Sequence, residues 1–120
     1  MTEPTGKNNR KHKRLNVDIP VKIVLTEGDV VRANLCNLSV SGAGITYPVA
    51  ADAGVVLELH FVVNTRQGRY PIQVKAQVVH NFLYKNQYVI GVSFMDMSKE
   101  QARALGEYLV VLQSLRRRQE

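Results

Sequence analysis

The chain has 120 residues, of which 45% are apolar and 22% charged, and its net charge is +6. This composition is typical of one soluble globular domain that buries a real core. No apolar run is long enough to span a bilayer, and none follows the basic start as a secretory signal would require. The single cysteine, Cys36, excludes an internal disulfide framework and favours a cytoplasmic location.

The positive charge is concentrated near the two ends of the chain. Residues 7–14 hold five basic residues and no acidic one, and Arg116–Arg118 add three more. Without these eight, the eight remaining basic residues face ten acidic ones, so the body of the chain is slightly acidic. We predict a disordered lead over residues 1–9, which contain no apolar residue after Met1.

The basic run Arg10–Arg14 allows two interpretations. It is either a solvated tail that aids solubility or a clamp for an anion. Arginine is planar and always charged, and it grips phosphate or a guanine edge with two parallel hydrogen bonds. The run ends where the first predicted strand begins, so a clamp here would lie beside the sheet.

Apolar residues then alternate with polar ones, and this period of two predicts six short strands separated by polar turns. Pro20 suggests either an edge strand or an early position in the strand, because proline cannot donate to a neighbouring strand. Six strands at this spacing favour a closed antiparallel barrel or a small sandwich. The predicted strands cover residues 15–25, 31–36, 45–47, 55–64, 72–78 and 88–94.

The segment Asn37–Gly44, between the second and third strands, combines small polar residues with glycines. A plain turn would explain the glycines, which take positive φ without steric cost. The alternative is a polar rim beside closely approachable backbone. Asn37 and Ser39 are two apart, so on a strand they project to the same side and could face a flat polar ligand such as a base edge.

The period changes after Ser98, and the sequence predicts an amphipathic helix over about residues 98–117. Ser98 and Gln101 form a capping box, and Arg116–Arg118 suit the negative end of the helix dipole. The apolar stripe either covers the mouth of a barrel or forms the seam of a dimer. Its members are Ala102, Leu105, Tyr108, Leu109, Leu112 and Leu115.

The two polar stretches meet if the first two strands are antiparallel neighbours. The start of one strand then lies beside the end of the other, and Arg10–Arg14 could fold over the rim at Asn37. A cationic clamp that faces a base-reading rim suits a ligand with both phosphate and base.

At these residues the sequence resembles the PilZ domain family, the bacterial receptors for cyclic di-GMP. The family is marked by R-x-x-x-R and D/N-x-S-x-x-G, which here are Arg10 with Arg14, and Asn37 with Ser39 and Gly42. Twenty-two residues lie between the two motifs. The strand ending Gly91-Val92-x-Phe94 and the C-terminal helix are also similar, so the resemblance covers residue 10 to about residue 115.

The resemblance implies a mainly all-β fold: a six-stranded antiparallel β-barrel with a C-terminal amphipathic helix. It also implies a role for each motif residue. Arg10 and Arg14 would grip guanine edges and phosphates, Asn37 would hydrogen-bond guanine, and Ser39 would add a hydroxyl contact. Gly42 would permit the turn. Many members carry Asp in place of Asn37, and one amide oxygen accepts less than two carboxylate oxygens, so we expect a lower affinity.

Three other functions were weighed. A nucleic-acid-binding β-barrel would need exposed aromatic residues on its strands, and the sequence shows no such cluster. A PilZ-fold adaptor that has lost its ligand would not need intact motifs. An enzyme is disfavoured because His12, His60, His80 and Cys36 share no metal-ligand spacing, and no Ser/His/Asp arrangement is legible.

The sequence therefore predicts a cytoplasmic receptor of one PilZ-like domain over residues 10–120. The resemblance implies that its ligand is cyclic di-GMP, and we expect no cofactor, metal or catalytic residue. We also expect a protein partner that the sequence does not identify, no nucleic-acid partner and no membrane span. We expect a monomer or a weak homodimer.

Overall fold

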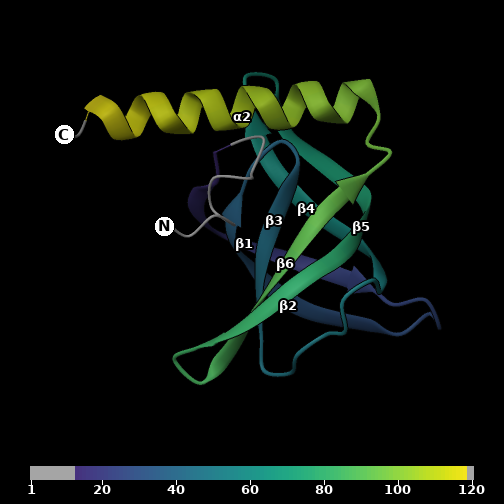
Figure 1. Ribbon diagram of the computed structural model, residues 1–120. Coiled ribbons are helices and arrows are strands. Elements are labelled where there is room, and N and C mark those ends of the chain that lie inside the picture. The colour runs from purple at the N-terminus through teal and green to yellow at the C-terminus, as the bar shows by residue number, and fades with distance from the viewer. Residues whose placement is uncertain (1–12, 119–120) are drawn as a thin grey trace.

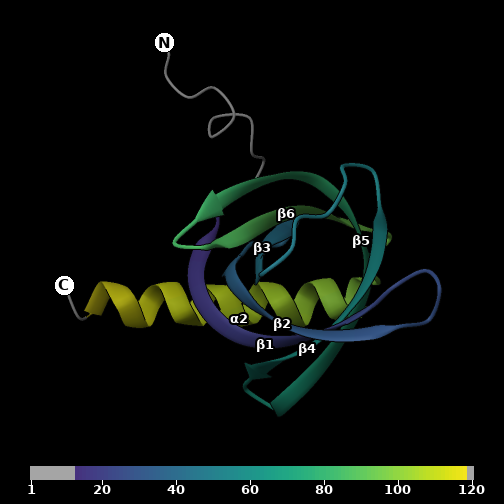
Figure 2. The same ribbon diagram turned by 90° about the horizontal axis from the view of Figure 1, so that it is seen from below.

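The structure is a computed structural model, which describes residues 13–118. Over these residues, six antiparallel strands close into a barrel and one helix follows (Figures 1 and 2). The predicted mainly all-β fold is confirmed, whereas the predicted lead over residues 1–9 lies outside the described residues. The elements are β1 (Leu15–Val24), β2 (Val30–Leu38), β3 (Gly42–Tyr47), β4 (Val56–Thr65), β5 (Gly68–Tyr84), β6 (Gln87–Met95) and α2 (Lys99–Arg118).

The strands follow the order β1-β2-β3-β6-β5-β4 around the barrel. The shortest strand pairing in the barrel is the one between β1 and β4, which involves only Lys22 to Val24 of β1. Pro20 lies before this pairing, on the part of β1 that β4 does not reach, so its missing N–H breaks no ladder there. Because the barrel is closed, β1 is not an edge strand; Pro20 lies instead in the earlier part of β1, before its pairing with β4 begins.

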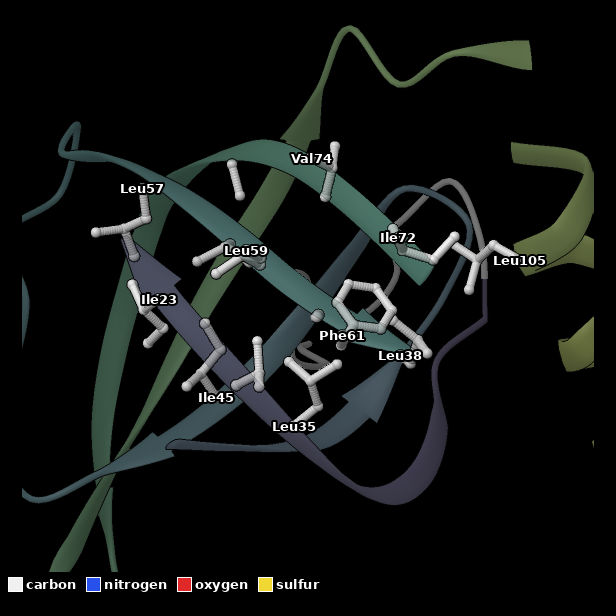
Figure 3. Close-up of a cluster of buried hydrophobic side chains, with 14 of the residues drawn as sticks. Ile23, Leu35, Leu38, Ile45, Leu57, Leu59, Phe61, Ile72, Val74 and Leu105 are labelled. Atoms are coloured by element: carbon white, nitrogen blue, oxygen red, sulfur yellow. The ribbon is translucent and has the colours of Figure 1, made fainter. Parts of the chain in front are cut away.

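Alternate residues of every strand point inward and form one apolar core (Figure 3). Burying one such leucine or isoleucine stabilises the fold by about 1.5–3 kcal/mol. Leu105 of α2 is fully buried and lies next to Ile72 of β5 at the edge of this cluster (Figure 3). The largest fully buried apolar side chains are Leu35, Leu38, Ile45, Leu59, Ile72, Leu105, Val63 and Val92.

Hydrogen bonds cap the N-terminus of α2 and tie its first half to the barrel. The Ser98 hydroxyl accepts a hydrogen bond from the Gln101 backbone N–H at 3.1 Å, which confirms the N-terminal cap. The Gln101 side-chain oxygen in turn accepts from the Gln73 backbone N–H on β5 at 2.5 Å. The Glu107 carboxylate accepts from the Arg66 backbone N–H at 2.6 Å, so the β4–β5 turn is tied to the helix as well.

The second half of α2 extends past the barrel (Figure 1). Val110, Val111 and Leu115 are exposed there. Ala102 is exposed too, so both ends of the predicted stripe differ from expectation. The stripe covers the barrel through Leu105 and Leu109. In residues 13–118, no helix combines the length and apolar character that crossing a membrane requires.

Strand β5 is longer than predicted because it contains a β-bulge. Its register to β6 shifts between Val78 and His80, where Val79 is the extra residue. The apolar–polar alternation breaks at this point, and the sequence pattern therefore ended the strand at Val78. Beyond the bulge β5 continues to a tight turn, in which Lys85 and Asn86 have φ of 51° and 67°. Two successive positive φ values are typical of the type I′ turn that joins twisted strands.

Candidate functional site

The structure brings Arg14 and Asn37 together, as the sequence predicted. Arg14 immediately precedes β1. Asn16, two residues after Arg14, pairs with Asn37 on β2. The Arg14 Nη1 donates a hydrogen bond to the Asn37 Oδ1 at 3.3 Å, and its Nη2 donates to the Val92 carbonyl oxygen at 3.5 Å. Both bonds are longer than the usual 2.7–3.2 Å, so they are weak. Arg10, the other predicted arginine, lies outside the described residues.

Ser39 fixes the turn between β2 and β3. Its hydroxyl accepts hydrogen bonds from the backbone N–H groups of Ser41 and Gly42, at 3.1 and 3.2 Å. The Ser39 N–H itself donates to the Gly42 carbonyl oxygen at 2.9 Å. The residue is only 1% exposed. In this conformation the hydroxyl serves the turn, and its contact to a ligand stays a prediction.

Two glycines leave space that the site uses. A Cβ on Gly42 would lie 2.4 Å from the Val92 carbonyl oxygen and 3.0 Å from the Arg14 Nη2. A Cβ on Gly44 would lie 2.4 Å from the Asn37 side-chain nitrogen. Gly42 therefore allows close approach of β6 and the guanidinium, and Gly44 allows the Asn37 amide to lie flat on β3.

The registers of five strands align one row of residues across the barrel. The row runs from Asn16 through Asn37, Gly44 and Gly91 to His80. It lies on the outer face, because the neighbours of the two glycines along β3 and β6 are buried in the core. The register shifts beside this row in three of the four strand pairs. Bulges of this kind commonly re-aim side chains next to functional sites.

We call the adjacent pair Gly44 and Gly91 the glycine floor. The Asn37 amide covers Gly44 from β2, and the His80 imidazole covers Gly91 from β5. A Cβ on Gly91 would lie 2.7 Å from the His80 Cε1, so the ring rests directly on the strand. Gly44, Gly91 and His80 were not among the predicted site residues. The break of alternation at Val78-Val79 was the signal that could have found His80.

Cys36 lies beside the site, at the bulge of β2 against β3. Burial raises the pKa of the Cys36 thiol, while a backbone hydrogen bond and the Arg14 charge oppose this effect. The Asn37 amide donates a weak hydrogen bond to the Cys36 sulfur at 3.7 Å. At neutral pH the group is therefore a thiol that supports the Asn37 amide.

An exposed aromatic row continues from the glycine floor along β5. It consists of His80, Phe82 and Tyr84, which the bulge turns to the outer face. The His80 and Phe82 rings stack with centroids 6.3 Å apart and planes 13° apart. The Lys85 Nζ lies 5.2 Å from the centre of the Tyr84 ring, within cation–π distance. The expectation that the strands carry no exposed aromatic cluster is therefore wrong.

Two other features of the described residues are separate from this site. A groove of about 600 Å³ lies where β1 parts from β4, lined by Pro20, Arg32 and His60 among others, and by none of the predicted site residues. His60 also contacts the Glu58 carboxylate at 2.7 Å. Among residues 13–118, no group of three His, Cys, Asp or Glu side chains could hold a metal ion.

Comparison with known proteins defines the class. The sequence matches the PilZ domain model over residues 8–110, and the chain therefore belongs to the PilZ domain family. A search of curated protein sequences gave no significant match.

Solved structures share the fold at low sequence identity. The inhibitor of motility MotI/DgrA of Bacillus subtilis superposes with a TM-score of 0.81 at 18% identity, covering 91% of this chain and 53% of MotI. The PilZ domain of YcgR from Escherichia coli, solved with c-di-GMP, gives 0.68 at 16%, covering 92% and 96%. The MrkH–c-di-GMP complex of K. pneumonia gives 0.75 at 13%, covering 93% and 56%. The chain thus spans about half the length of MotI and MrkH.

Proposed function

We propose that this chain is a non-catalytic receptor for cyclic di-GMP, which binds the dinucleotide between its N-terminal arm and the outer face at Asn37. The observation that carries the proposal is the placement of Arg14 against Asn37, with 3.3 Å between Nη1 and Oδ1. The two residues come from different family motifs, and here their side chains are in contact. The YcgR and MrkH structures that share the fold are complexes with c-di-GMP, which supports the same ligand.

Each site residue then has a role in binding. Arg14 and Arg10 grip the phosphates and guanine edges, since charged forks bind such groups in two parallel hydrogen bonds. Asn37 hydrogen-bonds a guanine edge. Gly42 lets the ligand and the guanidinium approach β6, and Ser39 holds the turn that presents Asn37. The ligand replaces the long Arg14 bonds to Asn37 and Val92 with shorter, charge-assisted ones.

The output of such a receptor is a change in protein–protein contacts. Binding draws the arm Arg10–Arg14 over the ligand, and this creates a surface that the ligand-free protein lacks. A protein partner then recognises the closed form, with no cofactor or metal involved. Fixing each arm residue costs about 1–2 kcal/mol in backbone entropy, so only the residues around the two arginines are expected to close.

Calorimetric titration of cyclic di-GMP into the purified full chain tests the proposal. Arg14→Ala and Arg10→Ala should each weaken binding roughly ten- to a hundred-fold, since a hydrogen bond to a charged group contributes about 1.5–3 kcal/mol. Arg32→Ala is the matched control, because Arg32 is an exposed arginine on β2 that lines the separate groove. Unchanged affinity in both arm variants would contradict the proposal.

The exposed aromatic row gives a specific reason to keep a second candidate in the same experiment. Single-stranded nucleic acids bind rows of aromatic residues flanked by positive charge. A short RNA and a short DNA are therefore titrated under identical conditions. Binding of either one at the affinity of cyclic di-GMP would favour a nucleic-acid-binding barrel.

A further inference from the structure

His80 is turned toward the site by the bulge in β5. Before the bulge, inward positions fall on even numbers, and Ile72, Val74 and Val78 are all buried. Simple alternation would place residue 80 inward as well. The extra residue Val79 reverses the pattern, so that His80 is exposed and pairs with Gly91 on the outer face. Such a bulge re-aims the side chain that follows it.

The glycine floor gives the imidazole its position. Any side chain on Gly91 would collide with the ring, because a Cβ there would lie 2.7 Å from Cε1 and 3.1 Å from both ring nitrogens. Gly44 is the cross-strand partner of Gly91, so the two glycines lie side by side between β2 and β5. The Asn37 amide lies against one of them and the His80 imidazole against the other, and Arg14 contacts the Asn37 amide.

Phe82 lies beside the ring. It is two residues further along β5 on the same face, and its ring is nearly parallel to the imidazole at 13°, with the centroids 6.3 Å apart. The imidazole therefore rests on the Gly91 backbone next to a second ring, and it remains exposed. An exposed flat aromatic surface fits a planar ring rather than a phosphate or a sugar.

We infer that His80 is the second wall of the site and stacks on a purine base of the ligand, opposite Arg14 and Asn37. This inference rests on the proposed function, because the base is the guanine of cyclic di-GMP. In this arrangement the phosphates lie with the arginines, and the base lies over the His80 imidazole that covers Gly91. His80 thus acts in selecting a purine rather than in attracting charge.

The test is a calorimetric titration of cyclic di-GMP with four variants beside Arg14→Ala. His80→Ala should weaken binding by roughly 5- to 100-fold, the range of base–aromatic stacking. His80→Phe should retain most of the affinity, since a phenyl ring stacks equally well. Gly91→Ala keeps the imidazole but displaces it from the floor, so it should also weaken binding. The control is His60→Ala, which removes a half-buried histidine on β4 that lines the separate groove, and it should leave binding unchanged.

Histidine ring NMR signals give a readout independent of affinity. The Hε1–Cε1 signal of His80, assigned from His80→Ala, should shift upon ligand addition, whereas that of His60 should not. If Arg14→Ala weakens binding but His80→Ala binds like the wild type, the second wall is overturned and the proposed function stands. Equal losses in His80→Phe and His80→Ala overturn stacking. A wild-type chain that binds no cyclic di-GMP overturns both proposals. Circular dichroism checks that each variant is folded.

Discussion

The two faces of β3 differ in what they require of their residues. On the inner face Ala43 and Ile45 are fully buried and fill the core. On the outer face Gly42 and Gly44 leave room for the Val92 carbonyl, the Arg14 guanidinium and the Asn37 amide. One residue along the strand therefore separates a position that needs apolar volume from a position that needs the absence of any side chain.

The two faces also differ in what holds them together. The inner face is stabilised by many buried apolar side chains, each worth about 1.5–3 kcal/mol. The outer face depends on a few polar contacts such as those of Arg14, each worth about 0.5–1.5 kcal/mol net. The barrel should therefore persist when the binding face is altered, so stability and binding can be changed separately.

The largest expected effect concerns the inner face. Leu105→Ala removes a fully buried side chain between α2 and the barrel, and it should lower the free energy of unfolding by about 2–5 kcal/mol. Leu115→Ala, on the same helix but 49% exposed, should change it by less than about 0.5 kcal/mol. Urea unfolding followed by circular dichroism measures both. Equal effects would show that α2 does not close the barrel.

A methyl group added to β3 tests the boundary between the two faces. In Gly42→Ala the new Cβ meets the Val92 main chain, which cannot move alone, so the protein should lose about 1–3 kcal/mol of stability. In Gly44→Ala the nearest atoms belong to the Asn37 side chain, which can rotate away. This variant should stay within about 1 kcal/mol of the wild type and yet bind cyclic di-GMP more weakly. Urea unfolding and calorimetric titration of both variants measure these effects. A larger loss of stability in Gly44→Ala than in Gly42→Ala would contradict the prediction.

The inner face could be predicted from the sequence because alternation is a local property. The six strands and the helix N-cap at Ser98 follow from residue types and spacing alone. The prediction was less complete at the ends of α2. The helix extends past the barrel, and the sequence does not record where the barrel ends, so the exposure of Leu115 was missed.

The outer face could be predicted only in part. Arg14 and Asn37 were found because each belongs to a motif, and antiparallel pairing of β1 and β2 brings the motifs together. The place of His80 depends on a bulge, and a single extra residue exchanges the two faces of a strand. We expected the Ser39 hydroxyl to contact the ligand. In the structure its oxygen instead accepts hydrogen bonds from two backbone N–H groups of the β2–β3 turn.

A negative charge at position 37 should strengthen the binding of cyclic di-GMP. Asn37→Asp supplies two carboxylate oxygens where the amide has one, and charged hydrogen bonds are stronger by about 1 kcal/mol. Affinity for cyclic di-GMP should rise by about fivefold. Asn64→Asp makes the same change at an exposed position on β4 and should have little effect. Weaker binding by Asn37→Asp, measured by the same titration, would contradict the role given to Asn37.

The smallest expected effect is on Cys36, whose half-buried thiol lies at the bulge of β2 beside Asn37. Burial raises its pKa and the positive charge of Arg14 partly opposes this, so at pH 8 less thiolate forms than on an exposed cysteine. Alkylation by iodoacetamide at pH 8 should therefore be slower in the folded protein than in urea. Arg14→Ala removes the opposing charge and should move the midpoint of the rate–pH profile further upward.

The pH profile separates this electrostatic effect from a change in access. Removing the Arg14 side chain could expose Cys36 and raise the plateau rate at high pH, but exposure would move the midpoint downward, because less burial means less desolvation. Arg32→Ala changes the net charge equally and should leave the midpoint in place. Bound cyclic di-GMP brings negative phosphates to Arg14 and should move the midpoint upward as well. A midpoint that falls in Arg14→Ala would show that access, rather than the Arg14 charge, controls this thiol.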